Sequence, residues 1–455
     1  MRPSATARLA LIGLGLAACY SGEQSESASG PETTLATESG ATESGAAESG
    51  ATESGATESG ATESGATESG ATESGATEGG ATEGGATEGD GGEPADPLAE
   101  LDRYSADDAR AYLSSIAPMV VGRLLTDSEL NLIDYFGGRG IVPVLDGWIE
   151  DAAFPETVRM MIQVKLHASG MTDTIDFELP GNLAAQIARD DLPFAEIITA
   201  DRCVDGAGAD VECDTGAPYN AGVLTTRAYL IANASRFNLQ RARRMMYIFN
   251  CLLYPMDTVL QPPLAKDSMI PMFRALTPEE QTEEEAQSGF GNGFACYSCH
   301  SQFGAHAQLF VKFDQDGLYR PEATGLQDPE DELGRSADGL FVSHFVDSIA
   351  AEQELSQVFG EPVANLAEAG EVLSSHPTFT QCSARNVIEW TFGLTEADAA
   401  TTAPALLVAI AERIFAEQPE PSIGDIFRAT LTHPDVIDVF LDSKSARPSA
   451  PGALQ

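Results

Sequence analysis

Residues 154–170, FPETVRMMIQVKLHASG, have the pattern of a single helix and indicate a helical fold class. Pro155 stands near the start, where a helix has no use for a backbone N–H, and Gly170 stands beyond the last apolar residue, where the chain can leave the helix. Apolar residues recur three or four positions apart between these two ends, which predicts an amphipathic helix.

The same signals recur along the rest of the body. Thr126-Asp127-Ser128-Glu129 is a capping box that opens a helix over Leu130–Phe136, and Thr277-Pro278-Glu279-Glu280 opens another. Alternating patterns typical of strands are scarce, and the best of them, Ile175–Leu179, is short. The sequence therefore predicts a mainly α fold. Further segments with helical spacing are Leu224–Tyr254 with a break near Asn233–Asn238, Phe341–Phe359, Val363–Ser374, Phe379–Phe392, Pro404–Glu417 and Ile423–Leu431.

A repeat precedes this helical body. The unit Ala-Thr-Glu-Ser-Gly, drifting to Ala-Thr-Glu-Gly-Gly, runs from Ala36 to Asp90. It contains nothing that could bury a core, and its glutamates repel one another, so we expect a disordered tether. A flexible coil of this length spans about 40 Å, and its charge extends it further.

The first residues have the pattern of an export signal. Arg2 and Arg8 form a positive start, and the apolar stretch Leu9–Leu16 is too short to span a bilayer. Leu16-Ala17-Ala18-Cys19 fits the lipobox of bacterial lipoproteins, which implies cleavage before Cys19 and lipidation of its sulfur. The alternative is an ordinary secretory signal cut near Ala18. We expect attachment to a membrane by the lipid anchor only, in the bacterial cell envelope, on the periplasmic side or at the outer membrane or cell surface.

The chain is strongly acidic, with a formal net charge of −45. This charge argues against nucleic acid as a partner and favours a basic partner protein. The one basic cluster is Arg236, Arg241, Arg243 and Arg244. Its expected role is the solvated side of a helix, and the alternative is a clamp for the propionates of a haem.

The pentapeptide Cys296-Tyr297-Ser298-Cys299-His300 carries the chemistry. Cys-x-x-Cys-His is the attachment signature of a c-type haem: Cys296 and Cys299 bind the vinyl groups covalently, and His300 ligates the iron. The alternative is a redox-active cysteine pair, or a local disulfide, that happens to precede a histidine. We therefore predict one covalent haem c.

Four cysteines remain after Cys19 and the haem pair: Cys203, Cys213, Cys251 and Cys382. An even remainder in an exported protein suggests two disulfides. Cys203 and Cys213 flank a loop rich in Gly and Asp, so they are the expected first pair. Cys251 with Cys382 is then the second, although the sequence leaves the other two pairings open.

The order of these blocks resembles the planctomycete-type multi-module cytochrome c proteins, whose modules of unknown function surround a haem c motif. That resemblance covers roughly residues 105 to 440 and implies haem and electron transfer to an unidentified redox partner protein. The sequence departs from the family pattern after His300, because residues 301–311 lack the Asp-Pro turn that the family usually carries there. Its residues are Gly122–Thr126 with Glu129, Ala221–Thr225, Cys251, Pro262-Pro263, the haem motif, Phe313-Asp314, Gly317, Tyr319-Arg320, His376-Pro377, Phe379, Cys382, Arg385 and Gly393.

The sixth iron ligand is left open. Every methionine precedes Cys296, so a downstream methionine is excluded. His344 is the first candidate, Met269 or Met272 the second, and an iron with no sixth ligand the third. His306 is too close to His300 to reach the opposite face, and His376 and His433 precede prolines that begin helices.

The sequence as a whole predicts a helical body with an embedded c-type haem module behind a disordered tether. The expected function is electron transfer by a membrane-tethered mono-haem lipoprotein rather than catalysis. The rivals are a haem enzyme with an open sixth site, acting on peroxide or a small oxide, and a non-redox surface lipoprotein. The expected segments are a signal peptide at 1–18, the lipidated tether at 19–95, helical modules at 96–270 and 341–445, and the haem module at 271–340.

Overall fold

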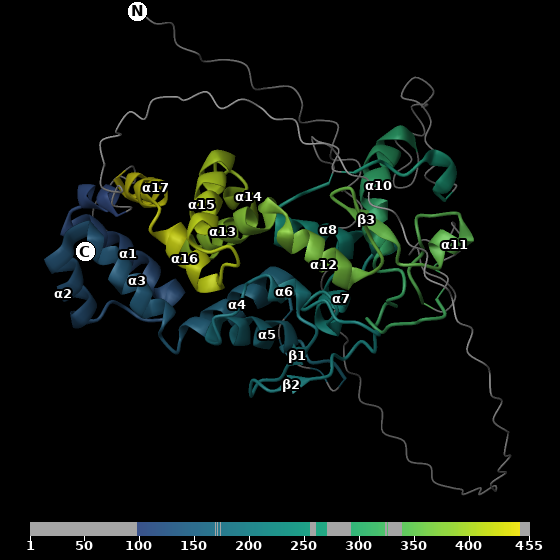
Figure 1. Ribbon diagram of the computed structural model, residues 1–455, viewed down its shortest axis with the longest axis horizontal. Coiled ribbons are helices and arrows are strands. Elements are labelled where there is room, and N and C mark those ends of the chain that lie inside the picture. Colours follow the sequence, from purple (N-terminus) through teal and green to yellow (C-terminus); the bar gives the residue numbers. More distant parts are fainter. Residues whose placement is uncertain are drawn as a thin grey trace, which may run out of the picture. The chain divides into compact units, whose positions relative to one another are not determined.

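The computed structural model describes residues 98–168, 170, 172, 174–254, 261–270, 293–323, 325 and 339–445 (Figure 1). The segments expected to be a signal peptide and a tether, Cys19, and the helix expected from Thr277 lie outside these residues. Within them the protein is mainly helical, as the sequence predicts. None of the described helices is long and apolar enough to cross a membrane.

Six α-helices form the first part of the described body. Ser105 and Thr126 begin the first two helices through capping boxes, and prolines stand in the first turns of the fourth and fifth. The helix expected from Phe154 is present, and it ends at Leu166, where His167 adopts a left-handed conformation with φ 54°. The helices are α1 (Ala106–Val120), α2 (Asp127–Phe136), α3 (Ile141–Ile149), α4 (Phe154–Leu166), α5 (Leu179–Arg189) and α6 (Glu196–Thr199), with short 3₁₀ turns η1 (Ala99–Arg103) and η2 (Gly137–Gly140).

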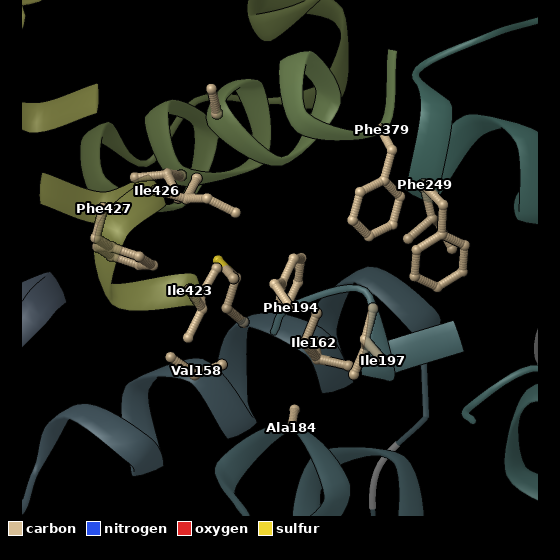
Figure 2. Packing of buried hydrophobic residues seen from close by; sticks show 14 of the residues in the cluster. Val158, Ile162, Ala184, Phe194, Ile197, Phe249, Phe379, Ile423, Ile426 and Phe427 are labelled. Carbon is tan, nitrogen blue, oxygen red and sulfur yellow. The ribbon is translucent and has the colours of Figure 1, made fainter. Parts of the chain in front are cut away.

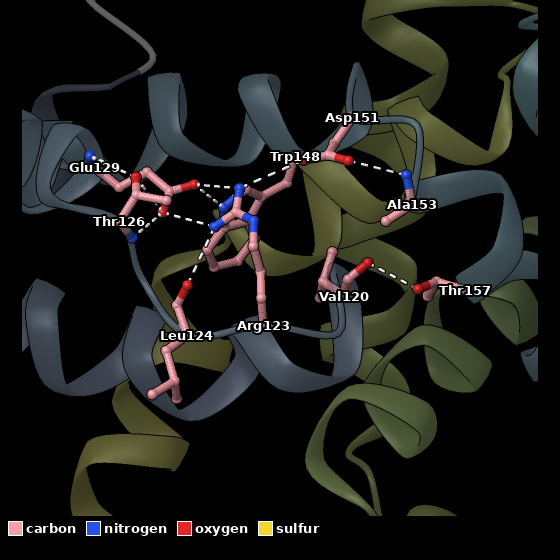
Figure 3. A network of polar contacts seen from close by, with 9 residues as sticks. All are labelled: Val120, Arg123, Leu124, Thr126, Glu129, Trp148, Asp151, Ala153 and Thr157. Atoms are coloured by element: carbon pink, nitrogen blue, oxygen red, sulfur yellow. Dashed lines mark hydrogen bonds and ion pairs between the residues drawn. The ribbon is translucent and has the colours of Figure 1, made fainter.

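The capping box of α2 is also the centre of a buried polar network (Figure 3). Glu129 accepts two hydrogen bonds of 2.9 Å from Arg123 and one of 2.6 Å from the indole of Trp148. Burial alone would raise the pKa of Glu129, but the hydrogen bonds from Arg123, Thr126 and Trp148 lower it to about 2. This network joins the loop after α1 to α2 and α3, which gives the Arg123, Thr126 and Glu129 block a structural role.

The region from 224 to 254 breaks where the sequence predicts. Phe237 and Asn238 both have positive φ, and they separate α7 (Arg227–Ala232) from α8 (Leu239–Asn250), with the 3₁₀ turn η3 (Arg236–Asn238) between them. The last third of the chain then supplies the helices α12 (Leu366–Ser375), α13 (Pro377–Phe392), α14 (Glu396–Ala399), α15 (Pro404–Glu417), α16 (Ile423–Leu431) and α17 (Pro434–Ser445).

One large apolar cluster runs through these helices, from Leu101 to Ile437. Figure 2 shows part of it, where Val158 of α4 and Phe194 lie opposite Ile423 of α16 and Phe379 of α13. Helices from the first and last expected modules therefore share a core. The expected module boundaries at 270/271 and 340/341 stay predictions.

Two sequence expectations about secondary structure are wrong. Ile175–Leu179 is not a strand, because Leu179 already begins α5. Phe341–Phe359 is not one helix, because it contains only α11 (Ser348–Ala351) and strand β3 (Ser356–Val358). The described strands are short antiparallel pairs, β1 (Cys203–Val204) with β2 (Asp210–Val211), and β3 with β4 (Glu361–Val363).

Candidate haem-binding site

The haem motif lies on α10 (Gly293–Gln308), which packs against α8 and β3 (Figure 1). Positions 296, 299 and 300 are separated by three and four residues, so they share one side of the helix. Cys299 and His300 are buried, at 6% and 2% exposure. The side chain of Cys296 lies outside the described residues.

His344 faces His300 across the site. Its Nε2 lies 3.1 Å from Nδ1 of His300, and the two ring centroids are 5.3 Å apart. The two residues are 44 positions apart in sequence, and His344 is fully buried. The structure thus brings together the motif histidine and the first candidate for the sixth ligand.

The backbone around His344 is fixed by pairing with an upstream segment. Met269 and Phe345 form an antiparallel bridge, in which the N–H of Ile270 donates to the carbonyl of His344 at 3.0 Å. The N–H of Val346 donates to Ser268 at 2.9 Å. The carbonyl of His344 and the N–H of Val346 are therefore satisfied outside a helix, in the stretch where the sequence predicts one.

A small apolar cluster, separate from the main core, surrounds the two histidines. It consists of Phe237, Leu264, Met269, Ile270, Ala305 and Val342. The ring of Phe303 lies 4.6 Å from that of His300, and the ring of Phe237 lies 5.6 Å from that of His344. Burial in these surroundings lowers the pKa of His344 to about 3, so the imidazole is neutral, which is the form that ligates a metal.

These residues fit a covalent haem in chemistry. The motif supplies two thiols and an imidazole, and His344 adds a second imidazole, whose Nε2 lies 3.1 Å from Nδ1 of the first. The apolar side chains around them would exclude water from a macrocycle.

The other candidate ligands are placed differently. His306 is buried and forms a hydrogen bond with the hydroxyl of Tyr254. His376 caps α13 through Thr378, and His433 precedes α17, as expected for turns before helices. Met269 is buried in the same apolar cluster as Phe237 and so stays the second candidate, whereas Met272 lies outside the described residues.

The four remaining cysteines form two disulfides, Cys203–Cys213 and Cys251–Cys382. These are the two pairs expected from the sequence. Cys203–Cys213 closes the loop between β1 and β2, and Cys251–Cys382 joins the end of α8 to α13. The second disulfide therefore links the region upstream of α10 to the C-terminal helices.

The expected role of the basic cluster is wrong for two of its members, because Arg241 and Arg244 are buried. Arg241 donates to the carbonyls of Leu230, Phe313 and Asp314 at 2.7–2.9 Å. Arg244 donates to Glu396 at 3.0 Å. These arginines tie helices and loops together, and the bonds of Arg241 occupy donors that a haem propionate would need.

Sequence reasoning missed a buried carboxyl group near α11. Glu354 accepts hydrogen bonds from the hydroxyls of Tyr219 and Tyr319, the second at 3.0 Å. Burial raises the pKa of Glu354 to about 7 against the opposing effect of these hydrogen bonds. The three residues are isolated polar positions in the sequence, so no local pattern indicates that they meet.

Comparison with known proteins adds nothing to this picture, since no family model, curated protein or solved structure matches the chain. In the part of the chain that the structure describes, no group of three or more His, Cys, Asp or Glu side chains could hold a metal ion. The site rests on the pentapeptide and on the geometry of the two histidines.

Proposed function

We propose that this protein is a mono-haem c-type electron-transfer protein of the bacterial cell envelope, held to a membrane by lipid on Cys19. Its resemblance to planctomycete-type cytochromes is part of this proposal. The observation that carries it is the meeting of His300, in an intact Cys-x-x-Cys-His motif, with His344 at 3.1 Å. A bound c-type haem would supply one-electron transfer at this place.

The residues of the chain have separate tasks in this proposal. Cys296 and Cys299 hold the haem covalently, and His300 and His344 ligate the iron from its two sides. Phe303 and the apolar cluster that contains Phe237 keep water away from the two histidines. Two ligating imidazoles leave no open position for a substrate, which favours electron transfer over the alternative of an enzyme acting on peroxide or a small oxide. The acidic chain favours a basic redox partner protein.

The first test is an optical spectrum of the protein produced with a working haem c maturation system. We expect a reduced α-band typical of haem c and a haem that stays on the peptide during acid–acetone extraction. Peptide mass spectrometry should then find the haem on Cys296 and Cys299. Loss of the haem to the solvent, with both thiols unmodified, would refute covalent attachment.

The second test replaces the proposed sixth ligand. His344→Ala should convert a six-coordinate low-spin spectrum into a high-spin one that binds carbon monoxide after reduction. His376→Ala is the matched control, because that histidine caps α13 and stacks on Phe359. A low-spin spectrum that persists in His344→Ala would rule out His344, and a thioether-to-iron charge-transfer band would assign the position to Met269 or Met272.

A further inference from the structure

The side chain of Gln308 forms several hydrogen bonds that join α10 to the segment carrying His344. It is the last residue of α10 and is fully buried. The two N–H groups of its side chain donate to the backbone carbonyls of Ala350, at 2.6 Å, and Gln353, and the carbonyl of Ala351 lies 3.4 Å from the same nitrogen. Its side-chain oxygen accepts a hydrogen bond from the hydroxyl of Ser343.

Ser343 links the side chain of Gln308 to the residues on both sides of His344. Its hydroxyl donates to Gln308 and accepts from the N–H of Phe345 at 3.0 Å. Residues 343 and 345 are thereby fixed, and His344 lies between them. The 343–353 segment has little regular structure apart from the bridge at Phe345 and the short helix α11, so these side-chain bonds add to the backbone pairing with residues 268–270.

The geometry of α10 adds a second argument. His300, Gly304 and Gln308 are each four residues apart, so they form one stripe along the helix. His300 meets the ring of His344. A Cβ at position 304 would lie 3.1 Å from Cγ of His344 and 2.8 Å from Cδ1 of Leu264, so any larger residue would push against the His344 ring. Gln308 forms hydrogen bonds with Ser343, which precedes His344, and with the 350–353 carbonyls, which follow it. This face of α10 therefore carries the proposed iron ligand His300, the glycine beside the ring of His344, and the Gln308 amide that bonds the neighbouring segment.

We infer that Gln308 is a positioning residue, which sets the place of the His344 imidazole relative to α10 through Ser343 and the 350–353 carbonyls. This inference rests on the proposed function, since it concerns the sixth ligand of the haem. It predicts that loss of the Gln308 amide frees His344 to leave the iron, although Gln308 touches neither histidine.

The experiment compares four variants of the full-length, haem-loaded protein. Gln308→Met keeps the length of the side chain and removes its hydrogen bonds, and Ser343→Ala removes the relay. Ser343→Thr restores a hydroxyl. Ser356→Ala is the matched control, because Ser356 also bonds the same helix, at the carbonyl of Ala305, but lies farther along the chain from His344.

We expect carbon monoxide to bind the reduced Gln308→Met and Ser343→Ala proteins at least about tenfold faster than the wild type, because His344 must leave before carbon monoxide can bind. The midpoint potential should shift in the same two variants. Ser343→Thr and Ser356→Ala should stay within about twofold of the wild-type rate. Rates within twofold of wild type for both Gln308→Met and Ser343→Ala would overturn the inference, and Ser343→Ala decides the matter if Gln308→Met fails to fold.

Deuterium exchange separates this inference from the proposed function. In protein made without haem maturation, the 343–346 peptide of Gln308→Met should exchange about tenfold faster than that of Ser356→Ala. If the wild type carries no haem but this difference is found, the proposed function fails and the positioning of His344 by Gln308 stands. If the haem is attached and low-spin but the two variants exchange alike, the positioning role is refuted and the proposed function stands.

Discussion

The Cys251–Cys382 disulfide should be the larger of the two covalent contributions to stability. It closes a loop over a sequence separation of 131 residues, whereas Cys203–Cys213 closes one of 10. In the chain-entropy treatment, a crosslink restricts the unfolded chain more strongly as the loop lengthens. The expected contributions are about 5 kcal/mol for the long loop and about 3 kcal/mol for the short one.

The folded state itself should survive the loss of the long crosslink. Asn250 donates to the carbonyl of Leu373 at 3.1 Å, and Asn386 donates to that of Ile248 at 2.9 Å. These hydrogen bonds keep the end of α8 against α12 and α13 without the disulfide. The effect of removing it should therefore act mainly through the unfolded chain.

The measurement is urea unfolding followed by far-ultraviolet circular dichroism. The double variant Cys251→Ser/Cys382→Ser should lose about 5 kcal/mol of unfolding free energy at most, and Cys203→Ser/Cys213→Ser should lose about 2 kcal/mol less. Reduction of the wild type should reproduce the combined loss. An equal or greater loss in the Cys203/Cys213 variant, or an unchanged midpoint in the Cys251/Cys382 variant, would refute the reasoning from loop length.

Three further predictions concern single residues. The pKa of Glu354 is about 7 in the folded protein, against 4.5 for an ordinary glutamate, so the folded state binds this proton more tightly than the unfolded chain. The stabilisation that the proton provides is therefore full below pH 4.5 and is lost as pH rises through 7. Glu354→Gln should therefore match the wild type near pH 4 and exceed its unfolding free energy by up to about 3 kcal/mol at pH 9; a constant difference between the two across this range would contradict the raised pKa. Arg241→Lys should cost about 3 kcal/mol in urea unfolding, because an ammonium group cannot reach all the acceptors of the guanidinium, and a cost below about 1 kcal/mol would show that these bonds matter little. Gly304→Ala should displace His344 and increase carbon monoxide binding to the reduced protein, and a spectrum identical to that of the wild type would contradict the close approach.

Features that depend only on neighbouring residues can be predicted from the amino-acid sequence. Thr126 and Glu129 form the expected capping box, and the proline at position 155 stands in the first turn of α4. The break between α7 and α8 also falls where the polar residues near Asn233 predict it. Caps, prolines and helical spacing act within one or two turns, so their effect can be predicted before the chain folds. The attachment motif is likewise a pentapeptide, complete in itself.

Contacts between residues far apart in the sequence become visible in the folded protein alone. His344 was one histidine among several in the sequence, and its contact with His300 depends on the pairing of residues 268–270 with 344–346. Neither Gln308 nor Glu354 stands in a recognisable pattern, and Arg241 belongs to a basic cluster typical of a solvated helix face. Arg241 is buried and not solvated, and a buried donor or carboxyl group must form its hydrogen bonds with the groups that the fold places beside it. Long-range contacts of this kind depend on the packing of the whole chain, which no local stretch of sequence specifies.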